Sequence, residues 1–244
     1  MLSRPWSLKE EVRMLVDPWT LFGRDGRVVT LFNPIISSSE IMSISGGVPA
    51  VAENFLSDLF LLAQESNDPV KIVINCPGGT VQGGFTIVQA MEHLKAKGIE
   101  VWTINMGLAA SMAGLILSVG TKGRRYVFNR ATTHAHEIQI KGMSGRSTDV
   151  EESQRHLKYM REEFENLLAV HTKIPEYFVK ITDLEINKSK LVDPEFRKKL
   201  IKEFIKQERL MTGPEAQEAG IVDQVLMPGD PLLDEIFRIL KRVE

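Results

Sequence analysis

The sequence predicts an α/β fold in a single domain, built from repeated β-α units with parallel strands and one long protruding helix. Two successive units carry this prediction. Residues 70–75 form an apolar run of strand length before a helical stripe over 80–94, and residues 99–106 form a second run before a small-residue helix that begins at Gly107. The third observation is length, because 244 residues suit one core with appendages.

The composition is that of an ordinary globular protein and excludes several other classes. Hydrophobic residues make up 43% and charged residues 25%, which argues against a disordered, collagen-like or coiled-coil chain. The 30 basic and 32 acidic residues give a formal net charge of −2. With this balance, neither a nucleic acid nor an anionic membrane is expected as a partner.

The cysteine content and the lack of long apolar runs indicate in which compartment the protein is found. The only cysteine, Cys76, cannot form an internal disulfide or supply a structural zinc site. The chain has no apolar run of about 18 residues, and its first residues lack the apolar core of a signal peptide. We therefore expect a cytoplasmic protein.

Further elements flank the two units. Residues 1–26 mix tryptophans with charges without a clear period and are expected to form an N-terminal arm. Residues 27–32 are predicted to form a short strand from their β-branched content, and 51–64 a helix from apolar residues at helical spacing. After the second unit, residues 125–128 and 131–136 indicate a strand pair or one bent strand.

The longest helical signal lies at 148–171, where apolar residues recur at intervals of three or four. Residues 184–206 are rich in lysine and have a narrow apolar face, which predicts a surface helix in an insert that contributes little to the catalytic core. Thr212 or Gly213 fits a helix cap before a last strand over 221–226. The domain is therefore expected to span 27–226, with a C-terminal helical tail over residues 227–244.

Two features of the β-α units could carry chemistry. Ser111 stands at a strand-to-helix junction among small residues, where a nucleophile could be reached, although helix packing or capping is the commoner role of a lone serine in this setting. Gly78 and Gly79 form a turn that lets a substrate backbone approach and leaves amides free for an oxyanion, although most such turns are only turns. No Lys-Ser/Thr pair follows them, so this is not a phosphate loop.

Two of the five histidines are placed to act as a base. His134 and His136 lie near the end of a strand and, two residues apart, point to the same face. They could also form a two-histidine metal edge, but the sequence offers neither an H-E-x-x-H motif nor a second cysteine. His93, His156 and His171 fall within or at the ends of helices, where solvated or capping roles suit them better.

Four motifs in order make the chain resemble the proteolytic subunit of the Clp protease family. They are Ile-Asn-Cys-Pro-Gly-Gly at 74–79, Gly-Leu-Ala-Ala-Ser-Met at 107–112, Asn-Arg-Ala-Thr-Thr-His-Ala-His at 129–136, and the stretch from Met-Thr-Gly-Pro-Glu-Ala to Gly-Ile-Val-Asp at 211–223. The resemblance spans residues 27–226 and implies the ClpP/crotonase-like fold.

The resemblance implies a set of site residues. Ser111 would be the nucleophile, and counting without gaps from it places the histidine base at His136, with His134 as its rival. The backbone amides of Gly79 and Met112 would form the oxyanion hole, in agreement with the glycine turn.

The acid of the triad follows from the same resemblance. In the family it is an aspartate beyond the histidine-threonine pair that ends the long helix, which from 171–172 gives Asp183. Family members pass quickly from that aspartate to the segment matching 208–212, whereas here the lysine-rich stretch 184–206 intervenes. Asp193 within the insert is therefore a rival.

The resemblance finally implies a function. It predicts a serine endopeptidase that cleaves unfolded proteins or peptides inside a homo-oligomeric ring chamber, with two stacked rings and an AAA+ ATPase unfoldase as partner. No cofactor and no metal are expected. The alternatives are a crotonase-like acyl-CoA enzyme, which needs two oxyanion-hole amides but no serine–histidine pair, and a catalytically silent ring subunit. The presence of both Ser111 and His136 speaks against each.

Overall fold

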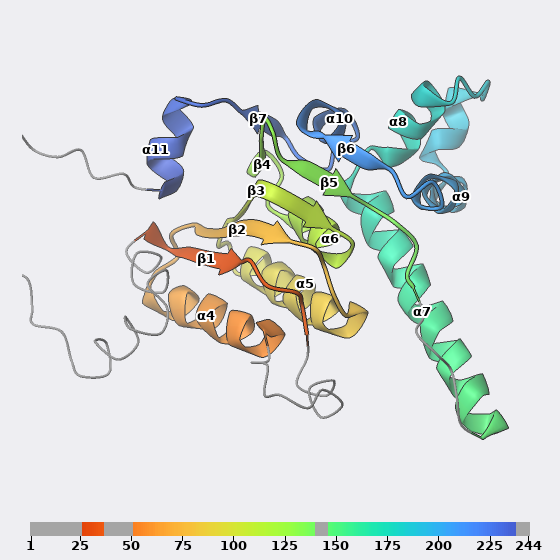
Figure 1. Ribbon diagram of the computed structural model, residues 1–244, viewed down its shortest axis with the longest axis horizontal. Coiled ribbons are helices and arrows are strands. Elements are labelled where there is room, and N and C mark those ends of the chain that lie inside the picture. The colour runs from red at the N-terminus through yellow and green to blue at the C-terminus, as the bar shows by residue number, and fades with distance from the viewer. Residues whose placement is uncertain (1–25, 37–50, 140–145, 238–244) are drawn as a thin grey trace, which may run out of the picture.

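The computed structural model describes residues 26–36, 51–139 and 146–237 (Figure 1). Nearly all of the predicted arm over 1–26 and the end of the predicted tail lie outside these residues. The described chain is a mixed α/β structure around one mainly parallel sheet, which confirms the predicted fold class.

The sheet has seven strands in the order β1-β2-β3-β4-β7, with β5 beside β3 and β6 beside β5. All neighbouring pairs are parallel except β5 and β6, which are antiparallel. The strands are β1 (Val28–Leu31), β2 (Val70–Cys76), β3 (Val101–Ala110), β4 (Arg125–Phe128), β5 (Thr132–His134), β6 (Leu210–Thr212) and β7 (Gln224–Leu226). The central strands read as apolar runs because both of their faces are covered.

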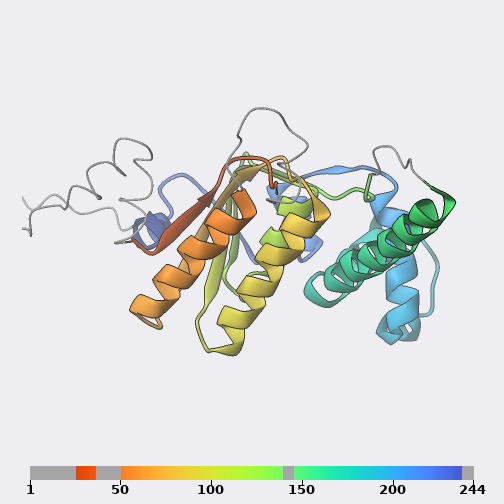
Figure 2. The same cartoon turned by 90° about the horizontal axis from the view of Figure 1, so that it is seen from below.

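Helices cover the sheet through the connections of the parallel strands. α4 (Val51–Glu65) and α5 (Val81–Ala96) lie side by side on one face (Figure 2). α5 begins after Thr80, whose hydroxyl accepts a hydrogen bond from the Gly83 amide at 3.3 Å. α6 (Met112–Val119) is buried along its whole length, as expected from its small and apolar residues.

β3 is longer than the sequence predicts, and its additional residues lead directly to Ser111. It pairs with β4 up to Asn105 and with β5 from Leu108, while its register against β2 shifts between these two pairings. The Oδ1 atoms of Asn75 and Asn105 accept the amides of Leu108 and Gly107, each at 3.1 Å. These bonds keep the bulged residues extended, so the prediction of a helix from Gly107 is wrong and α6 begins at Met112.

α7 (Ser147–His171) confirms the predicted long helix and protrudes from the body of the molecule (Figure 1). Its buried residues are Phe164, Glu165 and Leu168, all in the second half. The first half therefore has no core of its own within the described chain. α8 (Ile174–Ile181) follows directly, then a short 3₁₀ helix η1 (Lys188–Val192) and α9 (Pro194–Ile205).

The lysine-rich insert is part of the core. α9 buries Leu200, Ile201, Phe204 and Ile205 within the main hydrophobic cluster. The Phe204 ring meets Tyr177 and Phe178 of α8 edge-on, with centroid distances of 6.1 and 6.2 Å. The predicted narrow apolar stripe is therefore the face by which α9 packs on α7 and α8, and the small contribution of the insert to the catalytic core stays a prediction.

Polar contacts also join α9 to the end of α7. The Arg197 guanidinium donates to the carbonyls of Ala169 and Thr172 at 3.1 and 3.2 Å, and Lys202 lies 3.3 Å from the buried Glu165 carboxylate. Burial raises the pKa of Glu165, the larger effect, while Lys202 opposes the shift.

The C-terminal part returns to the sheet. α10 (Gly213–Glu218) starts at Thr212 with a reciprocal capping box to Glu215, which confirms the predicted cap. α11 (Pro231–Phe237) places Ile236 in a second, smaller core cluster with Trp102 and Tyr126. None of the helices described over 26–36, 51–139 and 146–237 has the length and apolar character needed to cross a membrane.

The burial of the insert predicts a stability effect. Phe204→Ala should lower the free energy of unfolding by about 3–5 kcal/mol, because it leaves a cavity and removes two aromatic contacts. Urea unfolding followed by circular dichroism measures this. Lys199→Ala, at an exposed position of the same helix, is the matched control and should stay within about 0.5 kcal/mol of wild type. Equal midpoints for the two variants would mean that α9 does not pack as described.

Candidate active site

Ser111 occupies a strained turn between β3 and α6. Its backbone has φ 56° and ψ −126°, a region that non-glycine residues rarely adopt. The turn is held on both sides: the Ser111 amide donates to the His134 carbonyl at 2.8 Å, and the Ser111 carbonyl accepts the amides of Gly114 and Leu115 at 3.0 and 3.2 Å. Strained backbone of this kind clusters at functional sites.

The hydroxyl of Ser111 is not used to start the helix. It stands at the cap position of α6, but its side chain makes no capping hydrogen bond within the described residues. Capping therefore does not account for a serine here. A strand-to-helix turn with positive φ is also how α/β-hydrolases expose a nucleophilic serine.

The glycine turn is pressed against this serine. A Cβ on Gly78 would lie 2.5 Å from the Ala110 carbonyl oxygen and 2.6 Å from the Cβ of Ser111, so no larger residue fits. The turn is fixed from its other side by Ile35, whose amide donates to the Gly78 carbonyl and whose carbonyl accepts the Thr80 amide, both at 2.8 Å.

Two amides near Ser111 have no acceptor among the residues that the structure describes. Those of Gly79 and Met112 donate to no group within the described parts of the chain. Met112 is the first residue of α6, so its amide has no intrahelical partner and carries part of the positive end of the helix dipole. Unpaired amides next to a nucleophile can stabilise a developing oxyanion.

His134 ends the strand that pairs with the end of β3 beside Ser111, and His136 follows two residues later, but the two rings differ in their surroundings. His134 pairs with Ala110 across β3 and β5, and its ring centroid is 5.1 Å from that of His136. His136 Nδ1 lies 2.5 Å from the Glu137 carbonyl oxygen. A carbonyl can only accept, so Nδ1 carries the proton and Nε2 is left as an acceptor. His134 Nε2 is instead buried and has no hydrogen-bond partner among the described residues.

The structure places Ser111 beside the histidine strand, but the serine hydroxyl is not hydrogen-bonded to a histidine ring. Within the described residues, no hydrogen bond joins the Ser111 hydroxyl to either imidazole; the contact between serine and histidine strand is the backbone bond to His134. Catalytic hydrogen bonds are often long in free enzymes and shorten when substrate binds.

The two candidate acids lie in the segment between α8 and α9. Asp183 is exposed just after α8, with φ 52°, and makes no contact with either histidine among the described residues. Asp193 caps α9, where its carboxylate accepts the Glu195 amide at 3.1 Å. The carboxylate of Asp193 therefore already has a structural role.

Cys76 lies beneath the glycine turn and is not a second nucleophile. Its thiol donates to the Asn33 carbonyl at 3.1 Å and accepts the Gly78 amide at 3.3 Å. Burial raises its pKa to about 11, so the reactive thiolate is scarce at neutral pH. Across residues 26–36, 51–139 and 146–237, no three His, Cys, Asp or Glu side chains gather as a metal site would require.

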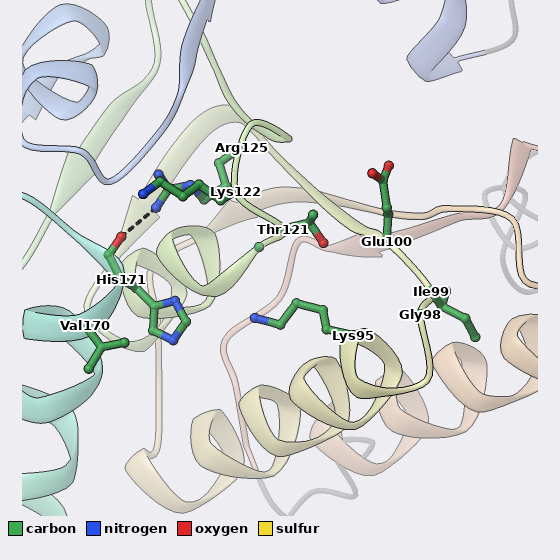
Figure 3. Close-up of a pocket in the computed structure, with 10 residues that line it drawn as sticks. Lys95, Gly98, Ile99, Glu100, Thr121, Lys122, Arg125, Val170 and His171 are labelled. Atoms are coloured by element: carbon green, nitrogen blue, oxygen red, sulfur yellow. Dashed lines mark hydrogen bonds between the residues drawn. The ribbon is translucent and has the colours of Figure 1, made fainter.

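A cavity of about 320 Å³ lies elsewhere, where α5, α6 and α7 end (Figure 3). Two of its cations, Lys95 and Arg125, bind the last carbonyls of α6 and α7. Lys95 donates to the Val119 carbonyl at 2.6 Å, and Arg125 donates to the carbonyls of Ser118 and His171 at 3.0 and 2.7 Å. Arg125 also forms a two-pronged ion pair with Asp223. This basic cluster therefore has a structural role, since it satisfies helix ends.

The side chain of His171 lies within the basic cluster. Burial, the larger effect, and the charges of Lys95 and Arg125 lower its pKa to about 4. The Glu92 carboxylate, 3.9 Å from Nε2, would favour the charged ring, but it is half-exposed and is outweighed.

The lowered pKa of His171 predicts that the folded protein loses stability in acid. The unfolded His171 takes up a proton near pH 6.5 while the folded ring stays neutral down to about pH 4, so stability should fall as the pH drops through this window. His171→Gln should remove a loss on the order of 2 kcal/mol, measured by urea unfolding at pH 7 and pH 4.5. His156→Gln, on the exposed face of α7, is the control and should follow wild type. A wild-type slope in His171→Gln would contradict the burial of this ring.

A comparison with protein families agrees with this geometry. The family model described as Clp protease matches residues 23–229, which is most of the chain and includes every residue of the candidate site. The match confirms the resemblance drawn from the four motifs and supports a protease role. The chain therefore belongs to the Clp protease family.

Proposed function

We propose that this protein is a serine endopeptidase that cleaves unfolded proteins or peptides inside a chamber built by its own oligomer. One observation carries the proposal: Ser111 is held in a strained turn, flanked by the unpaired amides of Gly79 and Met112 and bonded to the strand that presents the histidines. Strain at a serine whose hydroxyl has no structural use is otherwise unexplained.

The chemistry follows from the protonation of His136. Its Nε2 is free to accept the Ser111 proton while the serine oxygen attacks the peptide carbonyl. The same nitrogen then returns the proton to the leaving amine as the carbon–nitrogen bond breaks, and water hydrolyses the acyl-enzyme by the same route. The Gly79 and Met112 amides stabilise each oxyanion. A carboxylate stabilises the imidazolium, and the resemblance gives this role to Asp183.

We also propose the assembly that such a site requires. Members of the Clp protease family generally form oligomeric rings, and the first half of α7 offers surface without a core of its own, including Tyr159 at 59% exposure. We assign this half to contact between two stacked homo-oligomeric rings. An AAA+ ATPase unfoldase partner and a cytoplasmic location complete the proposal. The chemistry needs no cofactor and no metal, because side chains and amides supply every step.

The two alternatives explain less of the geometry. A crotonase-like acyl-CoA enzyme would use the same pair of amides but has no need for a strained serine. A catalytically silent ring subunit would need neither the strain at Ser111 nor the unpaired amides at Gly79 and Met112. Under either alternative, the strained backbone of Ser111 would serve no function.

Removing the hydroxyl tests the proposal directly. Ser111→Ala should lower the hydrolysis of a small fluorogenic peptide by roughly 10³-fold or more and abolish labelling by a serine-reactive fluorophosphonate. Ser153→Ala, on the exposed face of α7, is the matched control and should label fully. Both variants should sediment in the same large assembly as wild type. Peptide turnover by Ser111→Ala near the wild-type rate would remove the protease proposal, and a wild-type monomer at all concentrations would remove the chamber.

Mutation should distinguish the roles of the two histidines. His136→Ala should be as damaging as Ser111→Ala, and the double variant hardly worse, because members of one catalytic unit are not additive. His134→Ala should keep peptidase activity, because His134 holds Ser111 through its backbone carbonyl, which alanine retains. Peptide kinetics of the four variants measure this. An inactive His134→Ala beside an active His136→Ala would show that the base is His134.

A further inference from the structure

Two histidines lie side by side at the end of β5, the strand next to β3 in the sheet (Figure 1). The ring centroids of His134 and His136 are 5.1 Å apart, and the ring planes are inclined by 33°. Peptide hydrolysis needs a single imidazole as base, and the proposed function gives this role to His136. The ring of His134 is therefore left without a part in the chemistry.

One nitrogen of His134 also has no structural use. Its Nε2 is buried and has no hydrogen-bond partner among the described residues. Buried polar groups of native proteins nearly always have a partner, and an exception points to a function or to a water or ion that binds there. The side chain as a whole is only half-buried, so such a partner can come from outside the chain.

His136 is oriented as a metal-ligating histidine is. Its Nδ1 donates to the Glu137 carbonyl at 2.5 Å, which leaves the lone pair of Nε2 free. Histidines that bind a metal usually donate their other ring N–H to a carbonyl or carboxylate in this way. The tautomer that makes His136 a base therefore also makes it a ready metal ligand.

We infer that His134 and His136 together bind a Zn²⁺ ion through their Nε2 atoms, and that the bound ion inhibits the peptidase. Imidazole nitrogen is a preferred ligand of Zn²⁺, whereas Mg²⁺ and Ca²⁺ prefer oxygen. Alternate residues of an extended strand point to one face, so both rings can reach the same ion. The χ2 torsion of histidine has a broad minimum, which lets the His134 ring turn its Nε2 toward an ion beside His136.

Two protein ligands suit a reversible inhibitor and not a resident cofactor. No third His, Cys, Asp or Glu side chain joins the pair among the described residues, so water completes the coordination. The ion takes the Nε2 lone pair of His136 that would accept the Ser111 proton, so the serine has no base while zinc is bound. The inhibition rests on the proposed function, whereas the binding of zinc does not.

Zinc binding is measured on Ser111→Ala, where activity plays no part. The full chain without a histidine tag is titrated with Zn²⁺ in competition with a chromophoric chelator. Adding His134→Ala should weaken zinc binding at least roughly 10-fold, and adding His136→Ala should do the same. His156→Gln, on the exposed face of α7, is the matched control and should keep the affinity. Circular dichroism shows which variants fold, and either histidine variant alone is a sufficient test.

The fluorogenic peptide assay then tests the inhibition. Zn²⁺ should inhibit the wild-type chain, EDTA should restore its rate, and Mg²⁺ at the same concentration should have no effect. His134→Ala should need at least roughly 10-fold more Zn²⁺ for the same fractional inhibition.

Three results would overturn the inference: an unchanged zinc affinity in the folded histidine variants, equal zinc inhibition of wild type and His134→Ala, or inhibition by Mg²⁺ as strong as that by Zn²⁺. Failure of the proposed function looks different. In that case the wild-type chain would hydrolyse no peptide, while Ser111→Ala would still lose its zinc affinity on His134→Ala.

Discussion

The hydrogen bond from the Ser111 amide to the His134 carbonyl depends on a change of partner in the middle of the sheet. β3 leaves β4 after Asn105 and continues beside β5, and the turn into α6 follows at once. The side chains of Asn75 and Asn105 make the change possible, because they accept amides that the ladder no longer serves. The bulge therefore lies directly before the turn that holds Ser111 against the histidine strand.

Helix polarity divides the molecule into two ends with different electrostatics. α5 and α6 begin beside Gly79 and Ser111, so their positive ends face the place where an oxyanion would form. They finish at the basic cluster, where Lys95 and Arg125 donate to the last carbonyls of α6. Ligands of parallel sheets commonly bind outside the carboxyl ends of the strands, which here is the end with Ser111. At the opposite end, the charged side chains stabilise the fold.

Sequence patterns predict the parts of this fold that depend on neighbours along the chain. The β-α units, α7 and the Thr212 cap follow from periodicity and capping residues, and the family follows from its motifs. The extension of β3 does not, because it depends on Asn75 and Asn105 across strands. The burial of α9 also needs partners far along the chain. In the site, Ser111 and the histidines belong to contiguous motifs, whereas the acid lies outside these motifs, next to the insert, and stays a prediction.

The antiparallel pairing of β5 with β6 has a consequence for the order in which the protein folds. Between these short strands the chain builds α7, α8 and the buried α9, so the pair joins positions that are far apart in sequence. Closing so long a loop costs entropy, and it is favoured once the intervening helices have packed. The β-α units that hold Ser111 can form earlier from local contacts. A chain that leaves the ribosome would then form the turn at Ser111 well before β5 and β6 pair across the insert.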